Sequence, residues 1–381
     1  MKNKLFLDLH VLQTVPPSCL NRDDTGSPKT AIYGGARRAR VSSQSWKRAM
    51  RTQFFRERFE PTELGFRSKF VFKLIADKVQ EHPQKGSAYT EDSALKAVKD
   101  LFKKTGLLKE SKTEDGGKVL FPVDAKDENK LKTLFFISDM QAKNIAEIIV
   151  GDIDESTVKA AIIETLKKNM GVELALFGRM VAADAALNCD ASAQVAHAIS
   201  THRVENDSDF FTAVDDLSRE MDDHAGAGHL DTIEYNSATL YRYATVAVHD
   251  LFGQLAHDTA ALEKAVREFS RAFIGSIPTG KQNTFAAHTL PDAVLAAIRA
   301  DRPLNLAGAF EKPVRDIGGN GFVEPSALAL TEYAQSAYQD FCAAPAESYI
   351  VGRYLDGLGE RLTLDDMLLR LSHDIARRFG E

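Results

Sequence analysis

The sequence predicts an α+β protein in which a large helical segment interrupts the strands. Residues 4–13 alternate weakly and are rich in Leu, Phe and Val, as an opening strand would be. Apolar side chains then recur at helical spacing in four stretches of the segment 60–170, namely 70–80, 91–104, 139–150 and 155–168. After this segment, strand-like and helical stretches alternate along the chain. This order predicts an α+β domain with a helical insertion at 60–170.

The remaining elements follow in chain order. A short extended piece at 37–41 leads to Ser42 or Ser43, whose hydroxyl can cap a helix. In that helix Trp46, Met50 and Phe54 recur every four residues and form a stripe that we expect in the core. Further strands are expected at 173–177, 194–204 and 239–248, and further helices at 259–273, 327–341 and 364–378.

Composition excludes several classes of protein. With 381 residues, of which 44% are hydrophobic and 27% charged, the chain can bury a core in one elaborated domain or in two. No stretch approaches the roughly 18 consecutive apolar residues that a membrane helix needs. The first residues are typical of a strand and not of a signal peptide. Three cysteines far apart argue against disulfides, so we expect buried thiols and a cytoplasmic location.

Charge is distributed unevenly along the chain. The formal net charge of -6 argues by itself against nucleic acid. Yet residues 37–58 contain eight Lys or Arg and one acid, a net charge of +7, whereas residues 205–234 contain ten acids and one Arg, a net charge of -9. One basic patch and one acidic segment allow the molecule to attract both a polyanion and a second copy of itself.

The basic segment 34–51 has the features of a phosphate-binding surface. Two glycines are followed by three arginines, a helix start and three more cations. Free amides at a helix start favour a phosphate oxygen, and Ser42, Ser43 and Gln44 can add neutral hydrogen bonds. Lys47, Arg48 and Arg51 supply charge, and such contacts hold a backbone without reading bases. The alternative is a solvated basic helix face.

Two other motifs suggest chemistry that their context does not support. Residues 275–282 nearly match a phosphate-binding P-loop, but Gln282 replaces the hydroxyl that would hold Mg²⁺, and a helix precedes the loop. Lys281 could still approach a phosphate. His197 and His202, or His224 and His229, are five residues apart without a nearby cysteine, so we expect ordinary histidines and no zinc site. Neither a metal nor a cofactor is expected.

Seven short segments stand out in chain order: 17–24 (PSCLNRDD), 31–35 (AIYGG), 37–44 (RRARVSSQ), 178–180 (GRM), 196–202 (AHAISTH), 211–217 (FTAVDDL) and 280–282 (GKQ). Together, and in this order, they resemble the CasC backbone subunit family of the type I-E CRISPR Cascade complex. The resemblance spans most of the chain and is weakest at 60–170. It implies a ferredoxin-like (RRM-type) palm formed by 1–59 and 171–381, a helical fingers lobe at 60–170 and a protruding thumb at about 204–235.

The resemblance also implies roles for residues and partners. Ser42, Gln44, Lys47 and Arg51 would face the RNA backbone with Arg22 and Lys29 nearby, and Met180 would pack against a base of the guide. Copies of the chain would stack head to tail on the CRISPR RNA beside other Cascade subunits, and guide pairing would select target DNA in antiviral defence.

In the thumb, Phe210, Phe211 and Thr212 would lie beside a displaced nucleotide. Adjacent aromatics in a polar segment are costly to expose unless they are covered or used. They could instead anchor a loop to its own core. We expect the acids of this segment, Asp215 and Asp216 among them, to face the basic surface of the adjacent copy.

An enzymatic alternative remains. Related backbone subunits of other CRISPR types cut RNA with an Asp on a loop, and Asp23 and Asp24 are candidates for a metal-dependent ribonuclease here. No general acid pairs with them in the sequence, and Arg22 could form a salt bridge with either. The type I-E resemblance implies passive binding, so we expect no catalysis.

Overall fold

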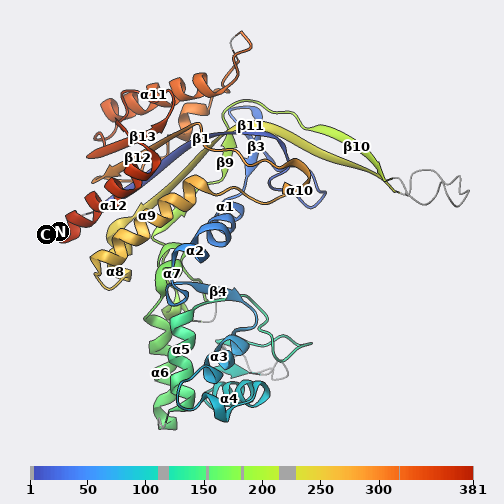
Figure 1. Ribbon diagram of the computed structural model, residues 1–381, viewed down its shortest axis with the longest axis vertical. Helices are drawn as coiled ribbons and strands as arrows, with labels where there is room; N and C mark the ends of the chain where they lie inside the picture. The colour runs from blue at the N-terminus through green and yellow to red at the C-terminus, as the bar shows by residue number, and fades with distance from the viewer. Residues whose placement is uncertain are drawn as a thin grey trace, which may run out of the picture. The chain divides into compact units, whose positions relative to one another are not determined.

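A computed structural model describes residues 4–109, 120–151, 154–181, 184–213, 229–316 and 318–380. Part of the expected thumb, residues 214–228 with Asp215 and Asp216, lies outside the described residues, as does His224. By its contacts the chain divides into two units (Figure 1). Unit 1 comprises Met1–Phe55, Gln194–His249 and Glu263–Glu381, and unit 2 comprises Arg56–Ala193 and Asp250–Leu262. Beyond the expected insertion at 60–170, unit 2 therefore includes residues 56–59, 171–193 and 250–262.

A ten-stranded sheet forms the centre of unit 1, in the order β14-β13-β12-β1-β11-β9-β3-β2, with β8 and β10 also paired to β11. The strands are β1 (Phe6–Ser18), β2 (Thr30–Tyr33), β3 (Ala36–Val41), β8 (Ala193–Val195), β9 (Ala198–Ser200), β10 (Asp207–Ala213), β11 (His229–Ala247), β12 (Ala293–Arg299), β13 (Glu347–Gly352) and β14 (Glu360–Arg361). β1 lies antiparallel to both of its neighbours, β11 and β12. These long-range pairings place the opening strand in the middle of the sheet.

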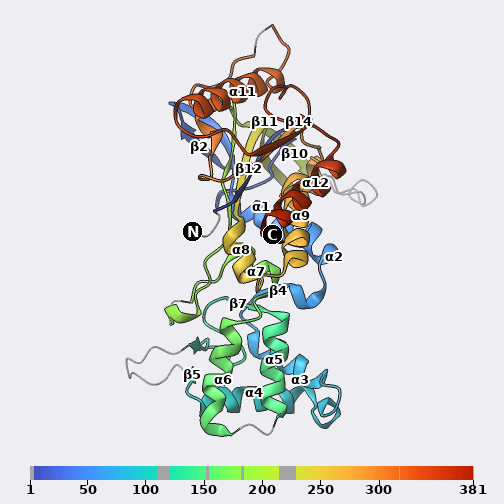
Figure 2. The same ribbon diagram turned by 90° about the vertical axis from the view of Figure 1, so that its left-hand side faces the viewer.

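Helices cover both faces of this sheet (Figure 2). The helices of unit 1 are α1 (Ser43–Met50), α9 (Thr259–Gly275), α10 (Gln282–Phe285), α11 (Val323–Asp340) and α12 (Leu364–Gly380), and a 3-10 turn, η5, spans Leu306–Phe310. Most of α8 (Val248–Gln254) belongs to unit 2. On one face Arg242 of β11 contacts Trp46 of α1 and Phe273 of α9. On the other face Tyr241 of β11 packs with Leu330 of α11 in one apolar cluster. Alternation along β11 therefore gives each face its own core.

Unit 2 is a small helical lobe with its own core. Its helices are α2 (Arg56–Arg58), α3 (Val71–Gln80), α4 (Glu91–Lys104), α5 (Asp139–Val150), α6 (Glu155–Lys167) and α7 (Gly171–Phe177), and its strands are β4 (Gly65–Ser68), β5 (Leu108–Lys109), β6 (Phe121–Pro122) and β7 (Phe135–Ser138). Phe72, Phe102 and Phe121 meet edge to face at centroid distances of 5.3–6.1 Å. The predicted helices at 91–104 and 139–150 are confirmed with the same bounds.

Three sequence-based expectations are wrong in detail. Residues 173–177 form helix α7 and not a strand; all five are buried, so their pattern has no periodicity that separates the two structures. The expected strand 194–204 is divided into β8 and β9. The stripe Trp46, Met50, Phe54 is interrupted because α1 continues as a π-helical turn, Arg51–Phe55, which buries Phe55 in place of Phe54.

The fold as a whole agrees with the α+β prediction, since one large sheet is combined with helices on both faces and a separate helical lobe. Among the helices of the described chain, none combines the length and the apolar character that crossing a bilayer requires.

Candidate nucleic-acid interface

The start of α1 is attached to a distant loop. Ser42 is the N-cap residue, but its hydroxyl makes no capping bond. Instead the backbone N–H of Ser42 donates to Oδ1 of Asn21 at 2.9 Å, and the N–H of Ser43 donates to Nδ1 of His197 at 3.2 Å. The predicted helix start is therefore confirmed, but its amides are held by side chains from two other segments. Ser42 itself is only 7% exposed.

The expected basic patch is smaller on the surface than in the sequence. Arg38 is fully buried, and its guanidinium donates to the carbonyl oxygens of Thr201 and Phe310 at 2.8 Å each. Arg56 and Arg58 belong to unit 2. Of the eight cations in 37–58, Arg38 is therefore not available to a ligand, because the sheet buries it.

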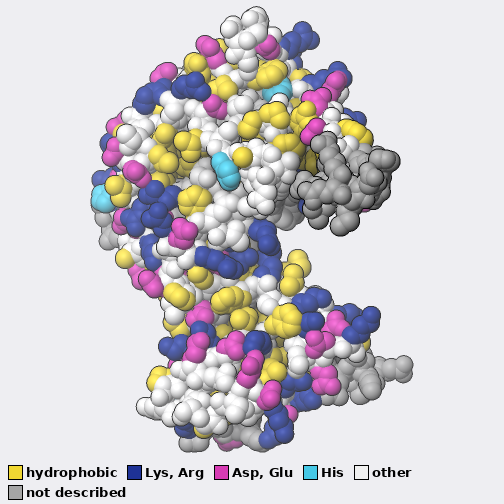
Figure 3. All heavy atoms as spheres, turned by 45° about the vertical axis from the view of Figure 1, so that its right-hand side comes forward, with side chains coloured by type: hydrophobic (Ala, Val, Ile, Leu, Met, Phe, Trp, Pro, Cys, Tyr) yellow, Lys and Arg dark blue, Asp and Glu magenta, His cyan; other side chains and the backbone are white. Residues whose placement is uncertain are grey.

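Three of the cations in unit 1 lie on α1 and the π-helical turn that continues it, and Arg37 and Arg40 lie on β3. Arg48 is exposed, and Lys47 and Arg51 are partly exposed, beside the exposed Gln44. Lys and Arg side chains are visible on both units on the face drawn in Figure 3. In unit 1, the predicted RNA-facing group on α1 thus remains accessible to a polyanion.

A polar pocket of about 440 Å³ lies between three segments of unit 1. Its lining comes from the loop 20–26, from the side of α1 that carries Ser45 and Arg48, and from Thr279 and Gly280. Gly280 is required here, because a Cβ at this position would lie 2.3 Å from the carbonyl oxygen of Leu20. This close approach brings together the segments of three predicted contacts, Arg22, Arg48 and Lys281.

Lys281 takes the left-handed backbone conformation, with φ of 51°, at the N-cap position of α10. A non-glycine residue in that region is uncommon and is often found at functional sites. Lys29 also lies near this group, because its N–H donates to the carbonyl oxygen of Asn21 at 2.9 Å. The segments that carry five of the predicted cations therefore meet at one side of unit 1. These cations are Arg22, Lys29, Arg48, Lys281 and the partly exposed Lys47.

Asp23 is engaged inside its own loop. Its Oδ1 accepts the hydroxyl of Thr25 at 2.8 Å and the backbone N–H groups of Thr25 and Ser27 at 3.0 Å each. The bond from the Thr25 hydroxyl, with these backbone N–H groups, lowers the pKa of the Asp23 carboxyl. A carboxylate that accepts three hydrogen bonds and has a low pKa is a poor general base. The geometry gives Asp23 the role of shaping the loop.

Met180 is presented by a rigid support in unit 2. Its side chain is 86% exposed. The preceding residue, Arg179, is buried, donates to the carbonyl oxygens of Leu187 and Leu166, and exchanges two backbone bonds with Cys189. Single exposed apolar side chains are common on protein surfaces, so this exposure leaves Met180 accessible without by itself marking a ligand contact. The prediction that Met180 contacts a ligand is consistent with this placement.

The described part of the expected thumb is a β-hairpin that extends from the sheet (Figure 1). β10 pairs with the first residues of β11 from Asp207 opposite Tyr235 to Ala213 opposite His229. Phe210 is 64% exposed, Phe211 is partly buried and Thr212 is exposed. Because the Phe210 side chain is not packed into the core, the alternative in which both aromatics anchor the loop does not hold for Phe210.

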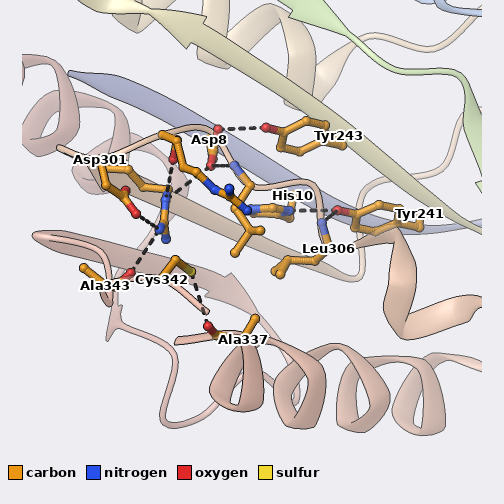
Figure 4. A network of polar contacts seen from close by, with 12 residues as sticks. Asp8, His10, Tyr241, Tyr243, Asp301, Leu306, Ala337, Cys342 and Ala343 are labelled. Atoms are coloured by element: carbon orange, nitrogen blue, oxygen red, sulfur yellow. Dashed lines mark hydrogen bonds and ion pairs between the residues drawn. The ribbon is translucent and has the colours of Figure 1, made fainter. Parts of the chain in front are cut away.

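A buried polar network in unit 1 escaped sequence reasoning (Figure 4). Asp8 and His10 lie two residues apart on β1 and therefore face the same side. The hydroxyl of Tyr243 donates to Asp8 at 2.9 Å, Nδ1 of His10 lies 2.9 Å from the hydroxyl of Tyr241, and Nε of Arg299 lies 4.0 Å from Asp8. Burial raises the pKa of Asp8 to about 6 and lowers that of His10 to about 3. The network is enclosed by α11 and η5, so it stabilises the sheet and does not reach the surface.

Among the described residues no group of three or more His, Cys, Asp or Glu side chains is placed to hold a metal ion. His197 and His202, which were weighed as a metal pair, have separate roles. His202 is buried and stacks on Phe322 at 3.7 Å, whereas His197 lies at the start of α1.

The family of the chain follows from comparison. A model of the CT1975-like protein family matches residues 7–368. The chain belongs to this family of Cas proteins. The family resemblance found in the sequence is thereby confirmed.

Solved structures agree with this CT1975-like assignment. The chain is 32% identical, with a TM-score of 0.78, to a chain described as "CRISPR RNA-guided surveillance complex, pre-nicking", over 96% of this chain and 99% of that one. It is 26% identical, with a TM-score of 0.68, to a chain described as "CRISPR RNA-guided surveillance complex", over the same shares. No curated protein matches the chain.

Proposed function

We propose that the chain is a non-catalytic backbone subunit of a type I-E CRISPR Cascade surveillance complex. In this role several copies assemble head to tail along the CRISPR RNA spacer and hold it by phosphate contacts, so that its bases remain available for pairing with target DNA. The observation that carries the proposal is the meeting of the cation-bearing segments 20–29, α1 and 279–282 around one open polar pocket.

Two further observations support it. Full-length similarity at 32% identity to a chain of an RNA-guided surveillance complex favours the same kind of partner here. The strand order β12-β1-β11-β9, with α1 between β1 and β9 in sequence and α9 between β11 and β12, favours the ferredoxin-like palm. The proposal includes no cofactor and no cleavage; of the two candidate carboxylates, that of Asp23 is occupied within its own loop.

The extended hairpin supports head-to-tail assembly. Its paired strands carry the acids Asp207, Asp209, Asp231 and Glu234. A projecting acidic hairpin with an exposed Phe210 is suited to the basic side of a second copy. A head-to-tail contact that does not close into a ring gives a helical filament, and the length of the RNA then limits the number of copies. Phosphate contacts from many copies on one RNA act together through high effective concentration.

The test is RNA binding by the purified protein over a salt series. We expect sequence-tolerant binding that weakens steeply with salt, because each phosphate contact on a single strand contributes a slope of about 0.7 in log–log form. Lys47→Glu/Arg51→Glu should reduce affinity more than about tenfold. The control, Arg370→Glu/Arg377→Glu on α12, changes the net charge equally and should bind as the wild type does.

Mg²⁺ is added to the same reactions to separate scaffold from ribonuclease. Intact RNA throughout supports the scaffold. Cleavage that disappears in Asp24→Asn would favour the ribonuclease, and equal loss of binding in the α1 variant and its α12 control would refute the interface.

A further inference from the structure

Lys29, Arg40 and His197 are carried by three neighbouring segments of unit 1: the residue before β2, strand β3 and the residue before β9. Lys29 and Arg40 are opposite one another, since the N–H of Arg40 donates to the carbonyl oxygen of Lys29 at 2.9 Å. Arg40 pairs in turn with Ile199 of β9. Directly opposed residues share a face of a sheet, so Lys29, Arg40 and Ile199 lie on the same face. His197 is the residue before β9, and its hydrogen bond with the N–H of Ser43 holds it beside the junction of β3 and α1.

The charges of Arg40 and Lys29 act on the imidazole of His197. The pKa of His197 is lowered by partial desolvation, then by the charge of Arg40 and then by that of Lys29. Both cations are therefore near enough to disfavour a third positive charge on the imidazole. His197 is consequently neutral at physiological pH.

The hydrogen bond to α1 determines which imidazole nitrogen carries the proton. Nδ1 of His197 accepts the N–H of Ser43 at 3.2 Å, so this nitrogen has no hydrogen. A neutral imidazole has one N–H, and in His197 it must therefore be on Nε2. Since the side chain is exposed, Nε2–H is a donor available to a ligand, held between two cations.

We propose that Lys29, Arg40 and His197 form a subsite for one RNA phosphate, in which Arg40 and Lys29 contribute charge and His197 contributes a neutral Nε2–H donor. The inference rests on the proposed function and adds two residues, Arg40 and His197, to the interface around α1. His197 has two functions in this subsite: its Nδ1 accepts the first amide N–H of α1, and its Nε2–H binds the phosphate.

The two nitrogens of His197 can be tested separately. In His197→Asn, the amide oxygen takes the place of Nδ1 and can accept the N–H of Ser43, but no donor reaches the position of Nε2. In His197→Gln, the amide nitrogen takes the place of Nε2, and the acceptor for Ser43 is lost. His197→Ala removes both, and His373→Ala, at an exposed histidine on α12, is the matched control.

Binding of a ten-nucleotide oligouridylate to the full chain is measured at pH 8 over a salt series, with the thermal midpoint of each variant. We expect His197→Ala and His197→Asn to lose about ten- to a hundredfold in affinity, as for one hydrogen bond to a charged group. His197→Gln should recover part of this loss, and His373→Ala should match the wild type.

The salt slope separates a neutral donor from a cation. Arg40→Ala should reduce the slope by about 0.7, whereas His197→Ala should leave it unchanged. Wild-type affinity in His197→Asn would mean that His197 acts only through Ser43, and a changed slope in His197→Ala would mean that it acts as a cation; either result overturns the subsite. If Lys47→Glu/Arg51→Glu loses binding while the His197 variants do not, this inference fails and the proposed function stands. If the wild type does not bind RNA, both fail.

Discussion

The guanidinium of Arg242 lies 3.8 Å from the centre of the Trp46 ring, and both side chains are 1% exposed. This contact joins β11, in the middle of the sheet, to α1, which carries the proposed RNA-binding cations. Arg242 also donates to Oε1 of Gln13 at 2.6 Å and to the carbonyl oxygen of Phe273. The orientation of the cationic helix therefore depends on a buried cation that no RNA can touch.

Replacing Arg242 with Met should lower the free energy of unfolding by about 2–4 kcal/mol, because Gln13 and the carbonyl of Phe273 would lose their buried donor. Burial lowers the pKa of Arg242 to about 9, so the side chain is still charged at neutral pH. Urea unfolding measures the effect. Arg353→Met, which breaks the exposed ion pair with Asp292, should cost no more than about 1 kcal/mol. Equal losses in the two variants would contradict the assigned role of Arg242.

Asp8 should make the protein less stable as the pH rises from about 4 to 6. Burial raises the pKa of its carboxyl to about 6, against an ordinary value of 3.8, although bonds from Leu304 and Tyr243 and the charge of Arg299 oppose the shift. The folded state thus binds this proton more tightly than the unfolded state, and the stability that the protonated group contributes is lost as the pH rises through 6.

The size of this effect is about 3 kcal/mol for two pKa units. The difference in unfolding free energy between the wild type and Asp8→Asn, measured from pH 4 to pH 7, should show it, since the variant lacks the titrating group. Parallel stability profiles for the two proteins would rule out the buried, protonated state of Asp8.

Gly280→Ala should distort the polar pocket that Gly280 lines. The added Cβ would lie 2.3 Å from the carbonyl oxygen of Leu20, so one of the two loops must move. We expect a loss of about 1–3 kcal/mol in stability, as for other overpacked positions, together with weaker RNA binding because Lys281 shifts with the loop. Gly253→Ala is the control, since its Cβ would meet no atom within 4 Å. RNA affinity equal in both variants would show that the loop does not matter for binding.

Substitutions at Met180 and Arg179 should distinguish an effect on RNA binding from an effect on the free energy of unfolding. Met180→Ala should leave the free energy of unfolding within about 0.5 kcal/mol of the wild type, because the side chain is 86% exposed, but should weaken RNA binding. Arg179→Met should cost about 3 kcal/mol, because the carbonyl oxygens of Leu187 and Leu166 would lose their donor. Unfolding in urea and RNA titration are needed for both. A large stability loss in Met180→Ala would mean that this residue is structural.

The helical lobe could be predicted well from the sequence, because its helices carry local signals. Thr90 and Ser138 cap their helices through side-chain bonds to residues three positions on, and the apolar spacing continues to the last turn. Such signals act within a few residues, so no tertiary information is needed to place α4 and α5.

Other features depended on contacts between distant segments. Arg38 and Arg40 are indistinguishable in the sequence, yet one is buried under η5 and the other lies beside His197 at the edge of the sheet. The sequence by itself determined the α+β class, the family and the cations on α1, because these follow from local periodicity and from motif order. Only the tertiary structure decided which cations reach the surface and which histidine lies among them. Burial and pairing across a sheet depend on residues more than 150 positions away, as with Arg38 and Ser200, and no local pattern records them.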